Sequence, residues 1–340
     1  MNKHHIKFSG EFPLESGEFL KDIEITYHTL GTLTENSKVV WICHALTANS
    51  DASDWWSGMI GNGKFFNGND YFVICANVLG SCYGSTGPMS VNKETGSQYF
   101  SKFPYVTVRD MVKAHNMLRK HLGIKSIYAL VGSSIGGFQA VEYTMFIQEH
   151  IEHLILIATN SRVTPWGTAF NEAQRMSIYA DKSYFDDTPT GGLDGMKAAR
   201  ATALLSYRSY EGYNRTQFED NDDTLFAEKA ASYEKYQGQK LANRFDAYSY
   251  VVMTKAIDSH NVGRNRGGVE KALSQINTKT LLVGIDSDLL FPPLEQKFMN
   301  KHIRDSFYVE ISSAFGHDGF LLESEQLSDI MTDFFLQKDF

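Results

Sequence analysis

Val131-Gly132-Ser133-Ser134-Ile135-Gly136-Gly137 is the stretch of this sequence that indicates its fold most directly. It follows an apolar run at residues 127–131 and leads into a segment of helical character, so it lies between a strand and a helix. There, a Gly-x-Ser-x-Gly pattern is typical of a nucleophile elbow, a tight turn that projects a serine hydroxyl above a sheet. Gly132 and Gly136 avoid a collision across the turn, and Gly137 lets the helix pack closely on the strands. We therefore predict that Ser134 is a nucleophile; the alternative is a Gly/Ser-rich loop without a catalytic role.

Length and composition describe an ordinary globular protein. A chain of 340 residues with 42% hydrophobic residues can form one large α/β domain with an insertion, or two domains. The formal charge of −8 argues against nucleic acid or an anionic membrane as the main partner. Three cysteines without paired spacing fit a reducing compartment, and none belongs to a cluster with zinc-site spacing. No stretch reaches the ~20 apolar residues of a membrane helix, so we expect a cytoplasmic protein without a metal.

Strand and helix patterns alternate along most of the chain. The helical segment at 107–123 has apolar residues at spacings of three and four, and Thr107 with Asp110 resembles a capping box. This alternation predicts an α/β fold with a mostly parallel, doubly wound sheet. The strands are expected at residues 23–29, 39–43, 71–75, 127–131, 153–158, 280–285 and 307–311.

The strand pattern disappears between residues 160 and 266, where the composition is polar and mostly helical, with helices expected at 198–207 and 227–236. We interpret this segment as a helical lid over the strand ends; the alternative is a helical subdomain that only packs. The predicted division is an α/β core of residues 1–160 and 267–340 with a lid insertion at 161–266.

A serine nucleophile needs a base, and the base needs a group that fixes its tautomer. Ser134, Asp288 and His317 each follow a predicted strand, in the chain order Ser, Asp, His that is typical of α/β hydrolases. His317 lies in a Gly-His-Asp-Gly turn whose small neighbours leave room for a ring and a substrate. Residue spacing alone leaves open whether Asp286 or Asp288 orients the histidine.

Such a site also needs donors for an oxyanion. In this fold they are backbone N–H groups, one directly after the nucleophile and one in the loop after an early strand. These positions are Ile135 and Leu46 here. His44 lies in the same early loop and is interpreted as structural rather than as a second base.

Several ordered blocks spread over nearly the whole chain resemble the homoserine O-acyltransferase family, chiefly the homoserine O-acetyltransferases. One departure is Ile135, which stands where the family often has methionine. The matching blocks are residues 44–47, 71–88, 107–111, 169–175, 236–240, 244–246, 287–292 and 316–318.

The resemblance implies an α/β-hydrolase fold with an inserted lid, in a homodimeric enzyme of methionine biosynthesis. It assigns the acid to Asp288, and it implies that Arg200, Tyr207 and Asp318 bind homoserine. An arginine fork suits the substrate carboxylate, and an aspartate suits its ammonium group. Acetyl-CoA would be a co-substrate rather than a bound cofactor.

The implied mechanism is a ping-pong transfer of an acetyl group through an acyl-Ser134 intermediate to the hydroxyl of L-homoserine. The sequence leaves three alternatives: succinyl-CoA as donor with homoserine or serine as acceptor, a serine esterase with the same triad, and a non-catalytic binding protein. Triad and oxyanion hole do not separate transferase from esterase, because both reactions form an acyl-serine.

Overall fold

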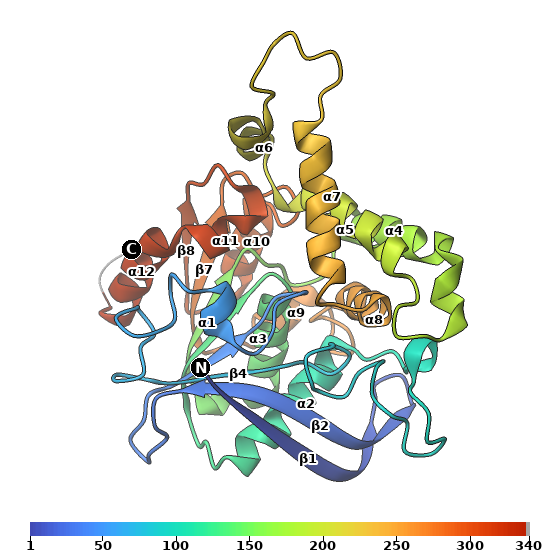
Figure 1. Cartoon of the computed structure of the whole chain (residues 1–340). Coiled ribbons are helices and arrows are strands. Elements are labelled where there is room, and N and C mark those ends of the chain that lie inside the picture. Colours follow the sequence, from blue (N-terminus) through green and yellow to red (C-terminus); the bar gives the residue numbers. More distant parts are fainter. Residues whose placement is uncertain (338–340) are drawn as a thin grey trace.

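A single eight-stranded sheet runs through the computed structural model, which describes residues 1–337 (Figure 1). The strand order is β1-β2-β4-β3-β5-β6-β7-β8. Strands β3 to β8 all pair in parallel, while β1 and β2, at one edge, each pair antiparallel with their neighbours. The predicted fold class is therefore confirmed. The strands are β1 (Asn2–Pro13), β2 (Phe19–Leu30), β3 (Val39–Cys43), β4 (Phe72–Ala76), β5 (Ile127–Ser133), β6 (Ile151–Ile157), β7 (Lys279–Ile285) and β8 (Ser306–Ile311).

Helices cover both faces of the sheet. Alternate residues of each central strand join different apolar cores: Trp41 packs with residues of α2, α3 and α10, while Val40 packs with those of α1 and α12. Burial on both faces explains why β3 reads as a continuous apolar run. The helices outside the predicted lid are α1 (Ala52–Trp55), α2 (Val108–His121), α3 (Ile135–Ile147), α9 (Val269–Leu273), α10 (Pro293–His302), α11 (Gly319–Leu322) and α12 (Ser324–Phe335), with 3₁₀ turns at η1 (Phe100–Lys102), η2 (Gln148–His150) and η4 (Gly316–Asp318).

Local signals placed the central elements accurately. The Thr107 hydroxyl accepts the N–H of Asp110 while the Asp110 carboxylate accepts that of Thr107, so the predicted capping box begins α2. β1 was not predicted, because most of its side chains are exposed and its apolar alternation is limited to Ile6, Phe8 and Phe12; its backbone pairing with β2 holds it on the sheet.

Between β6 and β7 the described chain forms helices and no strand. Figure 1 shows them gathered at one side of the sheet, with the segment between α6 and α7 reaching away from the body. The helices expected at 198–207 and 227–236 correspond to parts of α5 and α7. These elements are α4 (Pro165–Ala180), η3 (Lys182–Asp186), α5 (Leu193–Tyr207), α6 (Tyr210–Gln217), α7 (Lys229–Ala242) and α8 (Ala247–Asp258).

The division into a core of 1–160 and 267–340 and a lid of 161–266 stays a prediction, and its last residues, 338–340, lie outside the described chain. Within residues 1–337 no helix has both the length and the apolar character that crossing a lipid bilayer requires.

Candidate active site

Ser134 occupies the turn between β5 and α3 with a backbone conformation that is unusual for a residue with a side chain. Its φ is 56° and its ψ is −130°. Two contacts from the neighbouring chain hold it there: its N–H donates to Ile157 O at 3.1 Å, and Thr159 Oγ1 donates to its carbonyl oxygen at 2.8 Å. Such strain persists where the surroundings fix it, which is common at functional sites.

The glycines around Ser134 are sterically required. A Cβ atom on Gly132 would lie 2.1 Å from the carbonyl oxygen of Gly136, and one on Gly136 would lie 2.1 Å from that of Cys43. A Cβ atom on Gly137 would lie 2.4 Å from Thr159 Oγ1. These close approaches let α3 begin directly above β5, which is the geometry of a nucleophile elbow.

His317 and Asp288 meet at the ends of β8 and β7. His317 Nδ1 lies 2.7 Å from Asp288 Oδ2, and both side chains are buried. The other oxygen, Asp288 Oδ1, accepts the N–H groups of Leu290 and Phe291 at 2.8 and 2.9 Å. The carboxylate is thereby fixed, and a hydrogen bond from Nδ1–H leaves Nε2 as the basic nitrogen of the ring.

Burial and charge act in opposite directions on His317. Burial disfavours its protonated form, but the charge and hydrogen bond of Asp288, with a smaller contribution from Asp318, outweigh burial and raise the pKa of His317.

Asp286, the other carboxylate that the sequence left open, has a different environment. Its Oδ2 accepts the Ser312 hydroxyl at 2.8 Å and its Oδ1 accepts the N–H of Ser313 at 3.1 Å. It ties the loop after β7 to the loop after β8, so Asp288 is the carboxylate beside His317.

The loop after β3 is held by His44. Its Nδ1 donates to Ala45 O at 2.9 Å, its Nε2 accepts the N–H of Val78 at 3.2 Å, and Gln139 donates to its carbonyl oxygen at 3.0 Å. Burial lowers the pKa of His44 to about 4. This neutral ring orders the chain leading to Leu46, which agrees with a structural role.

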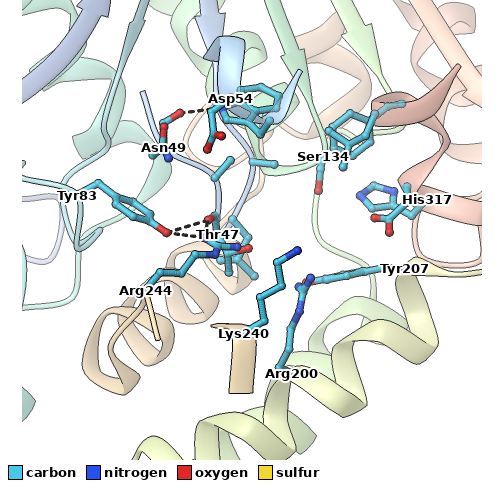
Figure 2. Close-up of a pocket in the computed structure, with 17 residues that line it drawn as sticks. Thr47, Asn49, Asp54, Tyr83, Ser134, Arg200, Tyr207, Lys240, Arg244 and His317 are labelled. Atoms are coloured by element: carbon cyan, nitrogen blue, oxygen red, sulfur yellow. Dashed lines mark hydrogen bonds between the residues drawn. The ribbon is translucent and has the colours of Figure 1, made fainter. Parts of the chain in front are cut away.

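The predicted residues converge on one cavity of about 620 Å³. Figure 2 shows Ser134 and His317 at one end of it, facing Arg200 and Tyr207 of α5. The Arg200 guanidinium lies over the Tyr207 ring, 5.5 Å from its centroid. Within residues 1–337 no hydrogen bond joins the Ser134 hydroxyl to His317; catalytic contacts of this type commonly tighten only with substrate.

Asp318 also lines the cavity, and its carboxylate has a partner that the sequence did not suggest. Arg208 Nε lies 2.8 Å from Asp318 Oδ2. Burial raises the pKa of Asp318, while Arg208, then His317 and Arg200, act against that rise. Arg208 directly follows Tyr207 at the end of α5, but only the tertiary fold brings it to Asp318.

Two further cations that line the cavity were also missed. Arg244 donates to the carbonyl oxygen of Thr47 and to the Tyr83 hydroxyl. Lys240 extends from α7 into the cavity, where its ammonium group contacts no hydrogen-bond or ion-pair partner in the described chain (Figure 2). Both residues lie in family-like sequence blocks, but a lone cation on a helix gives no signal of its own.

A smaller hollow of about 30 Å³ lies behind Ser134. Leu46, Ser134 and Ile135 all border it, so Leu46 and Ile135 lie near the nucleophile, and their role as oxyanion donors stays a prediction. Most of the remaining lining is apolar and includes Phe138, Val163, Ile257, Leu290 and Phe291. Among residues 1–337, no three His, Cys, Asp or Glu side chains are grouped so as to hold a metal ion.

Known proteins are similar to this chain in sequence and in architecture. The family model for the α/β-hydrolase fold matches residues 38–324. A homoserine O-acetyltransferase from Cyclobacterium marinum is 44% identical over 329 residues, which cover 96% of this chain and 93% of that protein.

Solved structures agree in fold. A homoserine O-acetyltransferase from Bacillus anthracis superposes with a TM-score of 0.89 at 25% identity, covering 98% of both chains. An acetylester hydrolase from Corynebacterium glutamicum has a TM-score of 0.85 at 22% identity, covering 98% of this chain and 95% of that one. The second likeness bears on the fold alone, since one fold can carry several reactions.

Proposed function

This chain belongs to the homoserine O-acetyltransferase family of α/β hydrolases, and from that premise we propose that it moves an acetyl group from acetyl-CoA to the side-chain hydroxyl of L-homoserine. The observation that carries the proposal is one cavity in which Ser134 and His317 face Arg200, Tyr207 and Asp318. The reaction would contribute to methionine biosynthesis in the cytoplasm.

The first half-reaction acylates the enzyme. His317, oriented by Asp288, takes the proton of the Ser134 hydroxyl, and the alkoxide attacks the thioester carbonyl of acetyl-CoA. The backbone N–H groups of Leu46 and Ile135 hold the tetrahedral oxyanion, and each such donor contributes about 3 kcal/mol to stabilising the transition state. The C–S bond then breaks, and CoA leaves as a thiol with the proton from His317.

The second half-reaction transfers the acetyl group. Arg200 pairs with the homoserine carboxylate, Asp318 pairs with the ammonium group, and Tyr207 lines the same part of the cavity beside Arg200. His317 takes the proton of the homoserine hydroxyl, whose oxygen attacks the acyl-Ser134 carbonyl. The ester bond to Ser134 breaks, the proton returns to Ser134, and O-acetyl-homoserine leaves.

Two features of the site support acetyl-CoA as donor: the small hollow behind Ser134 and the positive charges in the larger cavity. The hollow of about 30 Å³ behind Ser134 suits an acetyl methyl group, whereas the carboxylate of a succinyl chain would find no positively charged side chain among the described residues that line it. In the larger cavity, Lys240 and Arg244 offer positive charge to the phosphates of CoA. Succinyl-CoA remains the alternative donor.

A serine esterase is the main rival, because the triad and oxyanion donors serve it equally well. The Arg200, Tyr207 and Asp318 set favours the transferase, since it offers both charges of an amino acid a partner. A non-catalytic binding protein is the third possibility.

A thiol-release assay tests the proposal. Purified protein receives acetyl-CoA or succinyl-CoA, each with homoserine, with serine or without an acceptor. We expect fast release only with acetyl-CoA and homoserine. Release that is independent of an acceptor would indicate a hydrolase, and faster release from succinyl-CoA would indicate a succinyltransferase. A Ser134→Ala variant with unchanged turnover would revive the binding protein.

Exposed apolar side chains support a homodimer. Three of them lie on the segment that joins α6 to α7 and projects from the body: Phe218 is 68% exposed, Leu225 is 85% exposed and Phe226 is 74% exposed. An exposed apolar surface of this kind commonly marks a protein contact.

A further inference from the structure

Arg208 lies just behind the end of the cavity that would receive the amino-acid ammonium group. Its Nε is 2.8 Å from Asp318 Oδ2, and the two side chains are only 28% and 15% exposed. Asp318 lines the cavity, whereas Arg208 is outside its lining. The carboxylate is therefore placed between a fixed cation of the protein and the space for the substrate.

Backbone packing fixes the separation of this pair. The Ser209 hydroxyl donates to the carbonyl oxygen of Ala314. At Gly316, which has a φ of 64°, a Cβ atom would lie 2.8 Å from Ser209 N and 3.1 Å from Tyr207 O. The end of α5 is thus held tightly against the loop that carries His317 and Asp318.

The contact between Arg208 and Asp318 is an ion pair rather than a well-aligned hydrogen bond. Arg208 Nε is buried and has no hydrogen-bond acceptor in suitable geometry. No donor among the described residues makes a hydrogen bond to the Asp318 carboxylate, and Oδ1 has no ion-pair partner there, so that oxygen stays available to a ligand.

We propose that Arg208 is a positioning residue for the amino-acid acceptor: its guanidinium keeps Asp318 as an oriented, ionised carboxylate that can pair with the substrate ammonium group. The inference rests on the proposed function, because it requires Asp318 to receive an ammonium group. Arg208 itself does not touch the substrate.

The charges around Asp318 explain why a fixed cation is needed there. Asp318 faces Arg208 and Arg200 from α5, His317 from its own loop and Asp288 from the loop after β7. Burial raises the pKa of Asp318, and Arg208 is the strongest of the groups that oppose this rise. Without Arg208, Asp318 would take up a proton at a higher pH, and a neutral carboxyl group cannot form an ion pair.

The test compares full-length Arg208→Met and Arg208→Lys with the wild type. The homoserine KM and kcat are measured at saturating acetyl-CoA between about pH 5.5 and 9, where the acceptor amine stays largely protonated. For Arg208→Met we expect a homoserine KM roughly tenfold higher at the acidic end, which corresponds to about one pKa unit on Asp318. The increase should shrink as the pH rises, and Arg208→Lys should restore most of the affinity.

Two further measurements separate positioning from a purely structural link. Acylation of Ser134 without homoserine should be unchanged in Arg208→Met. Adding Arg208→Met to Asp318→Asn should raise the KM no further, because the two residues act as one unit. Arg215→Met is the matched control, since Arg215 pairs with Glu211 on the exposed surface of α6.

The outcomes are distinguishable. An equal KM increase at every pH, a loss of acylation, no rescue by lysine, or additivity with Asp318→Asn would each overturn the role of Arg208. A wild type without homoserine-dependent thiol release would overturn the proposed function as well. If the wild type shows homoserine-dependent thiol release and Arg208→Met has the same homoserine KM as the wild type, only the role of Arg208 is overturned.

Discussion

Single side chains in this site depend on a few fixed neighbours. His317 is buried, yet Asp288 holds its pKa above the usual range. A histidine acts as a base only in its neutral form, so activity should rise with pH through this raised pKa. Ser134 in turn depends on its backbone, which contacts from Ile157 and Thr159 keep in the elbow conformation.

Replacing Asp288 by Asn tests the histidine assignment. The loss of the negative charge should move the acidic limb of kcat/KM to lower pH, because the pKa of His317 would fall. Turnover should drop by roughly 10⁴-fold, since the ring loses its preferred tautomer. Thiol release as a function of pH measures both effects. Asp286→Asn is the control and should retain most activity; an unmoved limb in Asp288→Asn would contradict the assignment.

Arg200→Met tests the acceptor site at the same scale. Loss of a charge-assisted pair with the carboxylate should raise the homoserine KM by roughly 10- to 100-fold. Acylation of Ser134 by acetyl-CoA, followed by mass spectrometry of the intact protein, should stay near the wild-type rate. Undiminished homoserine turnover in this variant would refute the ligand assignment.

At the scale of elements, the connection from β5 to α3 sets the position of the nucleophile. The chain passes so close to the end of β3 that a Cβ atom on Gly136 would lie only 2.1 Å from the carbonyl oxygen of Cys43. Both partners are backbone: Cys43 lies in β3 at the centre of the sheet, and Gly136 lies in the first turn of α3 directly after β5, so neither can move without disturbing β3 or the elbow.

Gly136→Ala should therefore destabilise the protein by about 3 kcal/mol or more, through overpacking against the backbone. Urea unfolding followed by circular dichroism measures the change. Gly167→Ala in α4 is the matched control: its Cβ atom would meet only side chains, Val163 at 3.3 Å and the Thr164 hydroxyl at 3.7 Å, so the stability of this variant should stay the same or rise slightly. Equal stability of the two variants would show that the turn tolerates a methyl group.

At the scale of the whole molecule, a parallel sheet gathers distant segments at one edge. Loops after β3, β5, β7 and β8 bring Leu46, Ser134, Asp288 and His317 together. Helix α5 adds Arg200 and Tyr207, the residues proposed to bind the amino-acid substrate. In the proposed homodimer, the exposed segment between α6 and α7 would contact the second copy of the chain.

The dimer prediction is tested by sedimentation. The wild type should behave as a particle of twice the 38.3 kDa of the chain, because association buries the apolar segment. Leu225→Asp with Phe226→Asp should shift it toward 38.3 kDa. Phe146→Asp, at an exposed position of α3 far along the chain from this segment, serves as the control. A monomeric wild type would contradict the prediction.

The sequence by itself determined the elements and their order. Continuous apolar runs, capping residues and the glycines of the elbow act over a few neighbouring residues, so β3, α2 and the Ser134 turn could be read directly. The edge strand β1 could not, because most of its side chains are exposed and only a few apolar residues mark its inner face. The resemblance to a family, rather than spacing, suggested the amino-acid site.

Only the tertiary structure decided which side chains meet. It placed Asp288 beside His317, as the family resemblance implied and residue spacing could not show, and it left Asp286 to tie two loops. It also brought Arg208 to Asp318 and Lys240 into the cavity. These contacts depend on strand order and on the close packing of the α5 end against a loop more than a hundred residues away, so local periodicity carries no information about them.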